Sequence, residues 1–304
     1  AGVVDRLGLD YESVKATNPS IVYTVISGFG AKGPRSADPA YDGAIQAAAG
    51  MMANNGTAES GPLRTGYMPV DLMTGMTAAY ATTAALLRKQ KTGEGQMVDV
   101  AMLDCAITLG SANFARSEVD DVPDMLIGNQ SITSVPTASS FPTADGSILT
   151  AAIMPNHVEA FFDEIGLKEM LNDPKFATRE ARIENKEIVR DAMIEALQSD
   201  TAENWEKRLA PRGVPVAKIN SVSETSKLEQ LKYRNILAKV PAAKGMENGF
   251  KLPGAPFTNS EDGPEVMRPA PVLGQHTEEI LEEIGIDKST ISILEAEGVI
   301  CKDG

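Results

Sequence analysis

The sequence contains few of the residues that build disulfide frameworks and metal sites. Its 304 residues include two cysteines, Cys105 and Cys301, and two histidines, His157 and His276. The cysteines lie far apart and fit neither a disulfide framework nor a metal-ligand motif, so we expect buried or idle thiols and no metal site. Neither histidine has an evident serine or cysteine partner, so we expect capping or surface roles for both.

Positive charge and long hydrophobic runs are also scarce. Lysine and arginine number 28 against 42 acidic residues, which gives a net charge of −14. Nucleic-acid binding requires basic surface, so this balance argues against a nucleic-acid partner. The longest weakly polar run, residues 76–87, is too short and too rich in threonine to cross a bilayer, and residues 1–20 lack a signal-peptide pattern. We therefore expect a cytoplasmic protein without a membrane span.

The first 137 residues alternate between helical and strand patterns, which predicts an α/β domain. The expected helices are residues 11–17, 42–52, a helix from Met73 to Leu87 with Asp71 as its capping residue, and 105–116; the expected strands are residues 21–26 and 97–102. Lys89 and Lys91 suit the end of the third helix, and residues 92–95 form a turn before the second strand. This domain is expected to span residues 1–137.

A second, smaller α+β domain is predicted for residues 138–255. A loop-like connection at residues 120–140 leads into a hairpin at residues 141–153 with its turn at Asp145-Gly146. The further expected elements are helices at 157–165, 179–198 and 202–209, the last capped by Thr201, and a strand at 214–219. Residues 256–304 are expected to return to the large domain and to end in helices near 277–284 and 289–297.

A glycine-rich segment at residues 28–33 matches G-x-G-x-x-G after a predicted strand. A dinucleotide-binding fingerprint opens directly into a helix and is followed by an acidic residue about 20 positions later. Here residues 34–39 continue as a loop, and no second strand ends in such a residue. The glycines are better explained by a tight turn that lets the backbone approach a ligand or a neighbouring chain.

Asp71 alone has an ordinary interpretation, because almost every helix needs a capping residue. Its surroundings, however, closely resemble the core of the family III CoA-transferases, also called the CaiB/BaiF family. The similar segments are DLMTG (71–75), AALLR (84–88) and TGEGQMVDVAMLD (92–104). Further similar segments follow in family order at residues 18–23, 26–30, 39–42, 46–50, 128–129, 143–146, 173–178, 213–216 and 268–277.

The resemblance implies the fold and the residues of the site. It implies a Rossmann-like large domain with an open sheet, a smaller α+β domain, and a homodimer whose two chains are interlocked. Asp71 matches the catalytic nucleophile of the family, and Pro39, Ala40, Tyr41 and Asp42 match the segment that touches coenzyme A. Gly128, Asn129 and Gln130 match a loop over the acyl pocket, and small residues there suit a lid.

The resemblance also implies a chemistry in which coenzyme A moves from an acyl-CoA to a small carboxylic acid through a thioester on Asp71. Coenzyme A is then a substrate, and no permanently bound cofactor is expected. Helix N-terminal amides near Leu72 and Met73 are expected to stabilise the oxyanions. Lys32, Arg35 and Arg64 are the candidates for the phosphates. The acyl donor and acceptor stay open.

Two other functions compete with the transferase. Acyl-CoA racemases share the family fold but place a histidine at the position of Tyr41, and tyrosine, with a reference pKa near ~10, is a poor proton carrier at neutral pH. A noncatalytic CoA-binding subunit is disfavoured by the presence of Asp71. Family members also have a substantial segment before the position that matches Ala1, so the resemblance predicts that this chain lacks the N-terminal part of the large domain.

Overall fold

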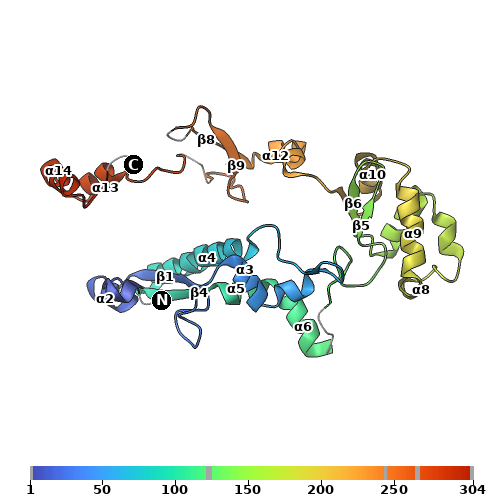
Figure 1. The fold of residues 1–304 in the computed structure, drawn as a ribbon, viewed down its shortest axis with the longest axis horizontal. Coiled ribbons are helices and arrows are strands. Elements are labelled where there is room, and N and C mark those ends of the chain that lie inside the picture. Colours follow the sequence, from blue (N-terminus) through green and yellow to red (C-terminus); the bar gives the residue numbers. More distant parts are fainter. Residues whose placement is uncertain (1–2, 121–124, 243–244, 264–267, 302–304) are drawn as a thin grey trace. The chain divides into compact units, whose positions relative to one another are not determined.

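The computed structural model describes residues 3–120, 125–242, 245–263 and 268–301 (Figure 1). The chain forms two compact units, residues 1–218 and residues 219–304. The division into three parts after residues 137 and 255 stays a prediction. Residues 121–124 of the predicted inter-domain connection lie outside the described residues.

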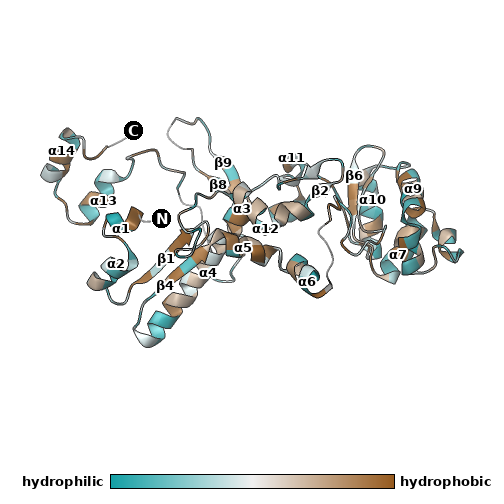
Figure 2. Ribbon diagram, turned by 60° about the horizontal axis from the view of Figure 1, so that its bottom comes forward, coloured by the Kyte–Doolittle hydropathy of each residue, from teal (hydrophilic) through white to brown (hydrophobic). Residues whose placement is uncertain are grey.

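A parallel pair of strands and the helix between them form the frame of the first unit. Strand β1 (Val22–Ser27) pairs in parallel with β4 (Gln96–Ala101) along its whole length, and both strands are largely hydrophobic (Figure 2). Parallel neighbours need a crossover connection, and α4 (Pro69–Thr92) lies in that crossover and packs on both strands. A 2.6 Å contact between the hydroxyls of Thr24 and Thr82 links α4 to β1. This β-α-β unit confirms the predicted α/β class.

Two glycines make the predicted turn between α4 and β4. Gly93 ends α4 in the left-handed conformation, with φ 76°. Gly95 lies so close to the neighbouring backbone that a Cβ atom there would sit 1.9 Å from the carbonyl oxygen of Ile21. Both positions therefore require glycine.

Shorter elements complete this part of the unit. They are α1 (Val3–Arg6), α2 (Tyr11–Thr17), α3 (Asp42–Ala48), the 3₁₀ helix η1 (Met51–Asn54), the small hairpin of β2 (Gly56–Thr57) and β3 (Gly61–Pro62), α5 (Met102–Leu109) and α6 (Ser111–Asp120). Helix α2 matches its predicted bounds, and Asp10 caps it by accepting from the amides of Glu12 and Ser13. The predicted helix 42–52 is shorter than expected, because α3 ends before the left-handed Gly50.

Two helices predicted as continuous are each broken into two. Residues 105–116 belong to α5 and α6, which are separated at Gly110, a poor helix former. Residues 179–198 form α8 (Arg179–Glu184) and α9 (Lys186–Leu197), separated at Asn185. The side-chain amide of Asn185 donates to the carbonyl oxygens of Lys175 and Ala181, so it competes with the backbone for helix acceptors.

The part of the unit from Ser140 to Lys218 places helices around a small antiparallel sheet. The sheet order is β5–β6–β7, and the first pair is the predicted hairpin. The strands are β5 (Ser140–Pro142), β6 (Ser147–Thr150) and β7 (Val216–Lys218); the helical elements, besides α8 and α9, are α7 (Pro155–Glu164), η2 (Lys168–Asn172), α10 (Ala202–Leu209) and η3 (Ala210–Arg212). Helix α10 has the predicted bounds and the predicted cap, Thr201, which accepts from the amide of Asn204.

The core of this part is built from large side chains. Phe141, Phe161 and Phe162 are fully buried and Trp205 is 2% exposed, in one cluster with aliphatic residues of the surrounding helices and strands. The indole nitrogen of Trp205 donates to the carbonyl oxygen of Leu197, so its one polar group is satisfied.

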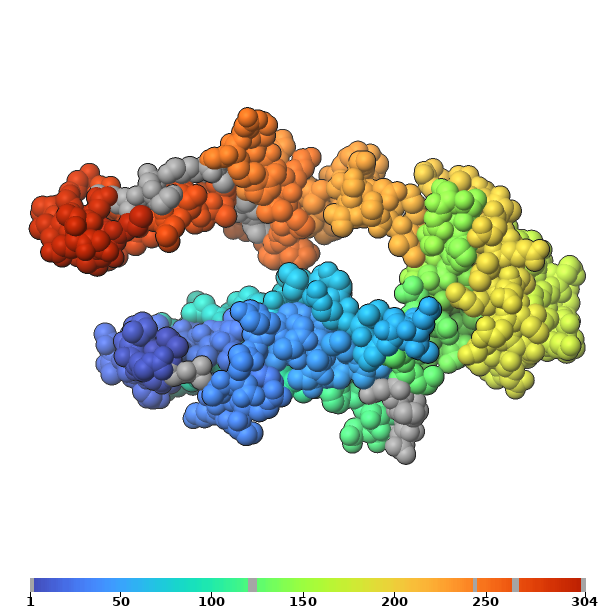
Figure 3. All heavy atoms as spheres, in the orientation of Figure 1, coloured from blue at the N-terminus to red at the C-terminus, as the bar shows by residue number. Residues whose placement is uncertain are grey.

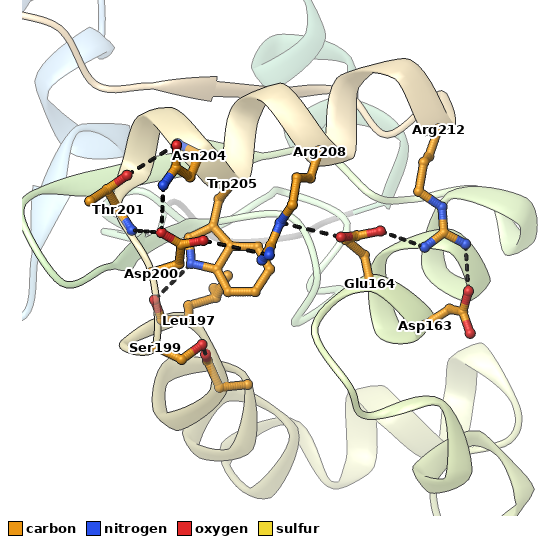
Figure 4. A network of polar contacts seen from close by, with 11 residues as sticks. Asp163, Glu164, Leu197, Ser199, Asp200, Thr201, Asn204, Trp205, Arg208 and Arg212 are labelled. Carbon is orange, nitrogen blue, oxygen red and sulfur yellow. Dashed lines mark hydrogen bonds and ion pairs between the residues drawn. The ribbon is translucent and has the colours of Figure 1, made fainter.

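A polar network at the surface joins α7 to α10 and η3 (Figure 4). Arg212 donates to the carboxylates of Asp163 and Glu164, and Arg208 lies between Glu164 and Asp200. The hydrogen bond from the Arg212 guanidinium, followed by that from Lys168, lowers the pKa of the Asp163 carboxyl below its ordinary value of 3.8.

The second unit, residues 219–304, is made of small elements (orange to red in Figure 3). They are α11 (Val222–Thr225), α12 (Glu229–Arg234), the hairpin of β8 (Leu237–Val240) and β9 (Phe250–Pro253), α13 (Thr277–Glu283) and α14 (Lys288–Ala296). Helices α13 and α14 agree with the prediction to within a residue or two, whereas the β8–β9 hairpin was not predicted. Among the described residues of this unit, Val240 and Ile291 are the buried hydrophobic ones.

Within the described ranges, no helix has the length and apolar character that crossing a membrane requires.

Candidate active site

Helix α4, which carries Asp71, begins earlier than the hydrophobic pattern predicted. It starts at Pro69, a residue favoured at the first position of a helix because it has no amide hydrogen to leave unbonded. Asp71 is thus the third residue of the helix and is exposed, rather than the residue that caps it. The predicted capping role of Asp71 is wrong, and Pro69 is the local signal that could have placed the start of the helix.

The cap of α4 is instead a side chain from a distant part of the sequence. One carboxylate oxygen of Asp42, Oδ2, accepts from the backbone amides of Val70 (2.9 Å) and Asp71 (3.1 Å). Met68, the residue before the helix, supplies no side-chain cap. Asp42 lies in the first turn of α3 and is 5% exposed, so a buried carboxylate on one helix caps the helix that carries Asp71.

This arrangement satisfies every amide at the start of α4. Pro69 has no amide hydrogen, Asp42 binds the next two amides, and the amide of Leu72 donates to the carbonyl oxygen of Met68 (3.2 Å). The Leu72 amide, one of the two donors expected to stabilise an oxyanion, is therefore already bonded within the helix. The same expectation for the Met73 amide stays a prediction.

A second set of contacts holds the segment that leads into α4. The side-chain amide of Gln46 donates to Asp42 Oδ1 and to the Thr65 hydroxyl, and its oxygen accepts from the Thr65 amide (3.0 Å). The Thr65 hydroxyl in turn donates to the carbonyl oxygen of Tyr67 (2.8 Å). Asp42 and Gln46, on neighbouring turns of α3, thus hold both the start of α4 and the residues just before it.

Hydrophobic packing fixes the residue next to Asp71. Val70 is fully buried with Ile45 of α3 and Ala106 of α5, and the partly buried Phe29 and Ala40 pack against the same cluster. Asp71 follows immediately and faces the surface, where Tyr67, Met68, Leu72 and Met76 are each more than half exposed. Asp71 is therefore anchored through its backbone while its carboxylate is accessible to a ligand.

The predicted coenzyme segment, Pro39, Ala40, Tyr41 and Asp42, lies beside Asp71, because Asp42 bonds to the Asp71 amide. Its members face different ways. Pro39 is exposed and Tyr41 is 84% exposed, whereas Ala40 is partly buried and Asp42 is buried. Of the four, Pro39 and Tyr41 offer accessible side chains to a ligand.

The glycine-rich segment at residues 28–33 forms a loop that continues without a helix to Ala40, which agrees with the rejection of a dinucleotide site. Gly28 allows a close approach, since a Cβ atom there would lie 2.2 Å from that of Ala40. The carboxylate of Asp99 on β4 accepts from the Ala31 amide and ties the loop to the sheet. Arg35, a phosphate candidate, is ion-paired with Asp38 (2.7 Å).

The contacts of the predicted substrate residues Gly128, Asn129 and Gln130 lie elsewhere in the unit. The Gly128 amide donates to the carbonyl oxygen of Gly56 in the β2–β3 hairpin (2.7 Å), and the Asn129 side chain donates to the Ser140 hydroxyl. Gln130 lines a small hollow together with Arg190 of α9. Their role near the acyl group stays a prediction.

A cavity of about 490 Å³ lies on the side of α3 that carries Gln46. It is lined by side chains that include Gln46, Asn55, Thr65, Asn113 and Phe114. Gln46 and Thr65 thus both line this cavity and join the contacts around the start of α4.

The two cysteines and the two histidines are the remaining residues that the sequence singled out. Cys105 is buried, Cys301 is exposed, and both thiols are free, as expected. His276 immediately precedes α13, where its side chain makes no capping hydrogen bond. Nδ1 of His157, on α7, is buried without a hydrogen-bond partner in the described structure.

Known proteins resemble this chain along most of its length. It is 29% identical to an acyl-CoA transferase of Fusarium pseudograminearum, with 98% of this chain and 65% of that protein covered. It is 32% identical to an acetyl-CoA:oxalate CoA-transferase of Acetobacter aceti, with 90% and 69% covered. The chain therefore spans about two thirds of the length of these curated relatives.

Solved structures confirm the predicted fold. A CaiB/BaiF family protein from Brucella suis matches with a TM-score of 0.80 and 27% identity, over 93% of this chain and 73% of that one. A protein from Mycobacterium tuberculosis matches with a TM-score of 0.77 and 26% identity, over 92% and 74%. The sequence model of the family described as CoA-transferase family III matches residues 1–277, and the chain belongs to this family.

Proposed function

We propose that the protein moves coenzyme A from an acyl-CoA thioester to a small carboxylic acid through a thioester formed on Asp71. The observation that carries the proposal is the position of Asp71. Its backbone is fixed by the buried Asp42 and Val70, and its carboxylate is exposed at the start of a long helix. A carboxylate that is rigidly held and accessible meets the two structural requirements of a nucleophile.

The first half of the proposed reaction transfers coenzyme A to the enzyme. A carboxylate oxygen of Asp71 attacks the acyl carbonyl and expels the coenzyme A thiolate, which leaves a mixed anhydride. The thiolate then attacks the Asp71 carbonyl and expels the donor acid, which departs with one oxygen that came from Asp71. The products are an Asp71–CoA thioester and a free carboxylate.

The second half repeats these steps with the acceptor. The acceptor carboxylate attacks the Asp71–CoA carbonyl, the thiolate leaves, and a second mixed anhydride forms. Attack of the thiolate on the acceptor carbonyl gives the new acyl-CoA and returns Asp71 as a carboxylate that contains one acceptor oxygen. The thioester is conserved, so the reaction needs neither a metal nor a nucleotide to drive it.

The names of the relatives support a small acid as acceptor. Besides the oxalate enzyme, they include a succinate–glutarate CoA-transferase of Agrobacterium fabrum, 29% identical, and a succinyl-CoA:mesaconate CoA-transferase of Haloarcula marismortui, also 29% identical. We propose that oxalate, succinate, glutarate and mesaconate form the first panel of acceptors. Tyr41 and Pro39 are the proposed coenzyme contacts, with Lys32 and Arg64 as the proposed partners of its phosphates.

Covalent trapping tests the proposal. The purified protein is incubated with succinyl-CoA or acetyl-CoA without acceptor, treated with hydroxylamine, and digested for mass spectrometry. The expected result is a hydroxamate on the peptide that contains Asp71, which disappears when an acceptor acid is added before trapping. Asp71→Asn should abolish both the adduct and the transfer, whereas Asp104→Asn, which changes an exposed carboxylate on α5, should retain both.

Two results would overturn the proposal. One is transfer at the normal rate by Asp71→Asn. The other is exchange of the α-proton of a branched acyl-CoA without any adduct, which is the outcome expected of a racemase.

A further inference from the structure

The buried carboxylate of Asp42 is the most unusual polar group near Asp71. It is 5% exposed, and burial of an ionised carboxylate is costly unless hydrogen-bond donors compensate for the lost water. Its donors in the described structure are the amides of Val70 and Asp71 and the side chain of Gln46. Both carboxylate oxygens therefore accept hydrogen bonds, and one of them binds the first turn of α4.

One of these donors is the backbone amide of Asp71 itself. A hydrogen bond of 3.1 Å therefore joins the main chain of the proposed nucleophile to a rigid, buried group. A carboxylate that attacks a thioester carbonyl must be placed closely, and a displacement of about 1 Å can cost roughly 100-fold in rate. Asp71 is exposed, so its placement depends mainly on what holds its backbone.

The contacts continue beyond Asp42 to the residues that enter α4. Gln46 joins Asp42 to Thr65, and the Thr65 hydroxyl joins Gln46 to the carbonyl oxygen of Tyr67. The same network thus holds the start of α4 and the approach to it. Loss of one member leaves a buried polar group without its partner, which costs more than an isolated surface hydrogen bond.

We propose that Asp42 is a positioning residue of the transfer reaction and acts on Asp71 through the first turn of α4; this inference rests on the proposed function of Asp71. It differs from the role that the family resemblance implied for Asp42, which was contact with coenzyme A. The neighbouring residue in the segment, Tyr41, is 84% exposed and, like Pro39, is accessible to the coenzyme. The segment therefore has one residue directed inward, at α4, and another directed outward.

Asp42→Asn tests this role, with Asp10→Asn as its matched control. Asp10 also accepts from the second and third amides of a helix, but of α2. The rate constant for adduct formation on Asp71 is measured at saturating acyl-CoA, together with the final labelled fraction and the dissociation constant of coenzyme A.

Asp42→Asn should slow adduct formation by roughly 10- to 100-fold, as expected of a misplaced nucleophile. The labelled fraction should still reach completion, and the dissociation constant of coenzyme A should stay within about twofold, a change of less than 0.5 kcal/mol. Asp10→Asn should leave all three quantities unchanged. A role in general folding would lower the labelled fraction without slowing the labelling of the folded molecules.

Thr65→Val provides a second variant if Asp42→Asn does not fold. It removes the hydroxyl contacts with Gln46 and Tyr67 and leaves the bonds of Asp42 in place, so a smaller, several-fold slowing is expected. The inference is overturned if neither variant slows adduct formation, or if Asp42→Asn weakens coenzyme A binding while the rate constant is unchanged. Failure of the proposed function is recognised separately, because Asp71→Asn would then still transfer coenzyme A.

Discussion

The part of the first unit around Asp71 and the part from Ser140 to Lys218 are held together by different means. The second has a core of large side chains, with Phe141, Phe161, Phe162 and Trp205 in one buried cluster. The first has a small cluster around Ile45 and Val70, and a buried carboxylate that connects α3 to α4. The free energy of unfolding of the part from Ser140 to Lys218 is therefore expected to depend on side-chain volume. The position of Asp71 in the other part is expected to depend on hydrogen bonds.

The largest expected effect is on the stability of the part from Ser140 to Lys218. Phe162→Ala removes a fully buried ring and should reduce the free energy of unfolding by about 3–5 kcal/mol. The labelling rate of Asp71 in the molecules that stay folded should be unchanged. Urea denaturation and adduct formation, measured on the same sample, check both quantities. The proposed difference between the two parts is contradicted if the labelling of Asp71 slows while the free energy of unfolding is unchanged.

A clash near the site is expected to have a smaller effect on stability but a direct effect on rate. Gly28→Ala introduces a Cβ atom 2.2 Å from that of Ala40, and such overpacking costs about 1–3 kcal/mol. Ala40 precedes Tyr41 and Asp42, so the displacement should also slow adduct formation. Gly146→Ala, where a Cβ atom meets nothing within 4 Å, is the control. Equal rates for the two variants would contradict the expected coupling between the glycine loop and the site.

Helix α4 itself should tolerate a change that favours helix. Gly75 lies inside the helix, and a Cβ atom there meets nothing within 4 Å. Gly75→Ala should therefore raise the free energy of unfolding by roughly 0.5–1 kcal/mol, because glycine loses more backbone entropy on folding. Thermal unfolding measures the change. A loss of stability instead would indicate that another chain packs against this side of α4, as in the predicted homodimer.

The smallest effect concerns the surface network of Figure 4. Arg212 lowers the pKa of Asp163 below its ordinary value of 3.8, so the contribution of this contact is complete above that pH and is lost as the pH falls through the lowered pKa. Arg212→Met should therefore lower the melting temperature slightly at neutral pH, and the difference from the parent protein should shrink below pH 3.8. Melting curves at several pH values measure it. A difference that grows in acid would contradict the assignment.

The sequence predicted the part from Ser140 to Lys218 better than the start of α4, and the reason is physical. Helix α10 has its predicted bounds because its cap, Thr201, is local and its apolar positions recur at helical spacing. The breaks in the two helices were not predicted, because the hydrophobic periodicity continues across Gly110 and Asn185. The short β2–β3 and β8–β9 hairpins give too weak a pattern to be predicted.

The site shows the same limit more clearly. The family resemblance selected Asp71 and the segment that ends at Asp42, and the structure brings the two together. It did not indicate that Asp42 caps α4, because the two partners are 28 residues apart and a cap is normally sought just before its helix. Pro69 was a local sign of the true helix start. The contacts of Gln46 with Thr65, by contrast, could be recognised only in the three-dimensional structure.

The most direct measurement of the central claim follows the oxygen atoms of Asp71. The Asp71–CoA thioester is formed with acyl-CoA, isolated from excess substrate, and discharged once with an acceptor acid labelled with oxygen-18. The two mixed anhydrides predict that the carboxylate of Asp71 recovers one labelled oxygen, detected by mass spectrometry of its peptide. Full transfer to the acceptor with an unlabelled Asp71 would contradict the account.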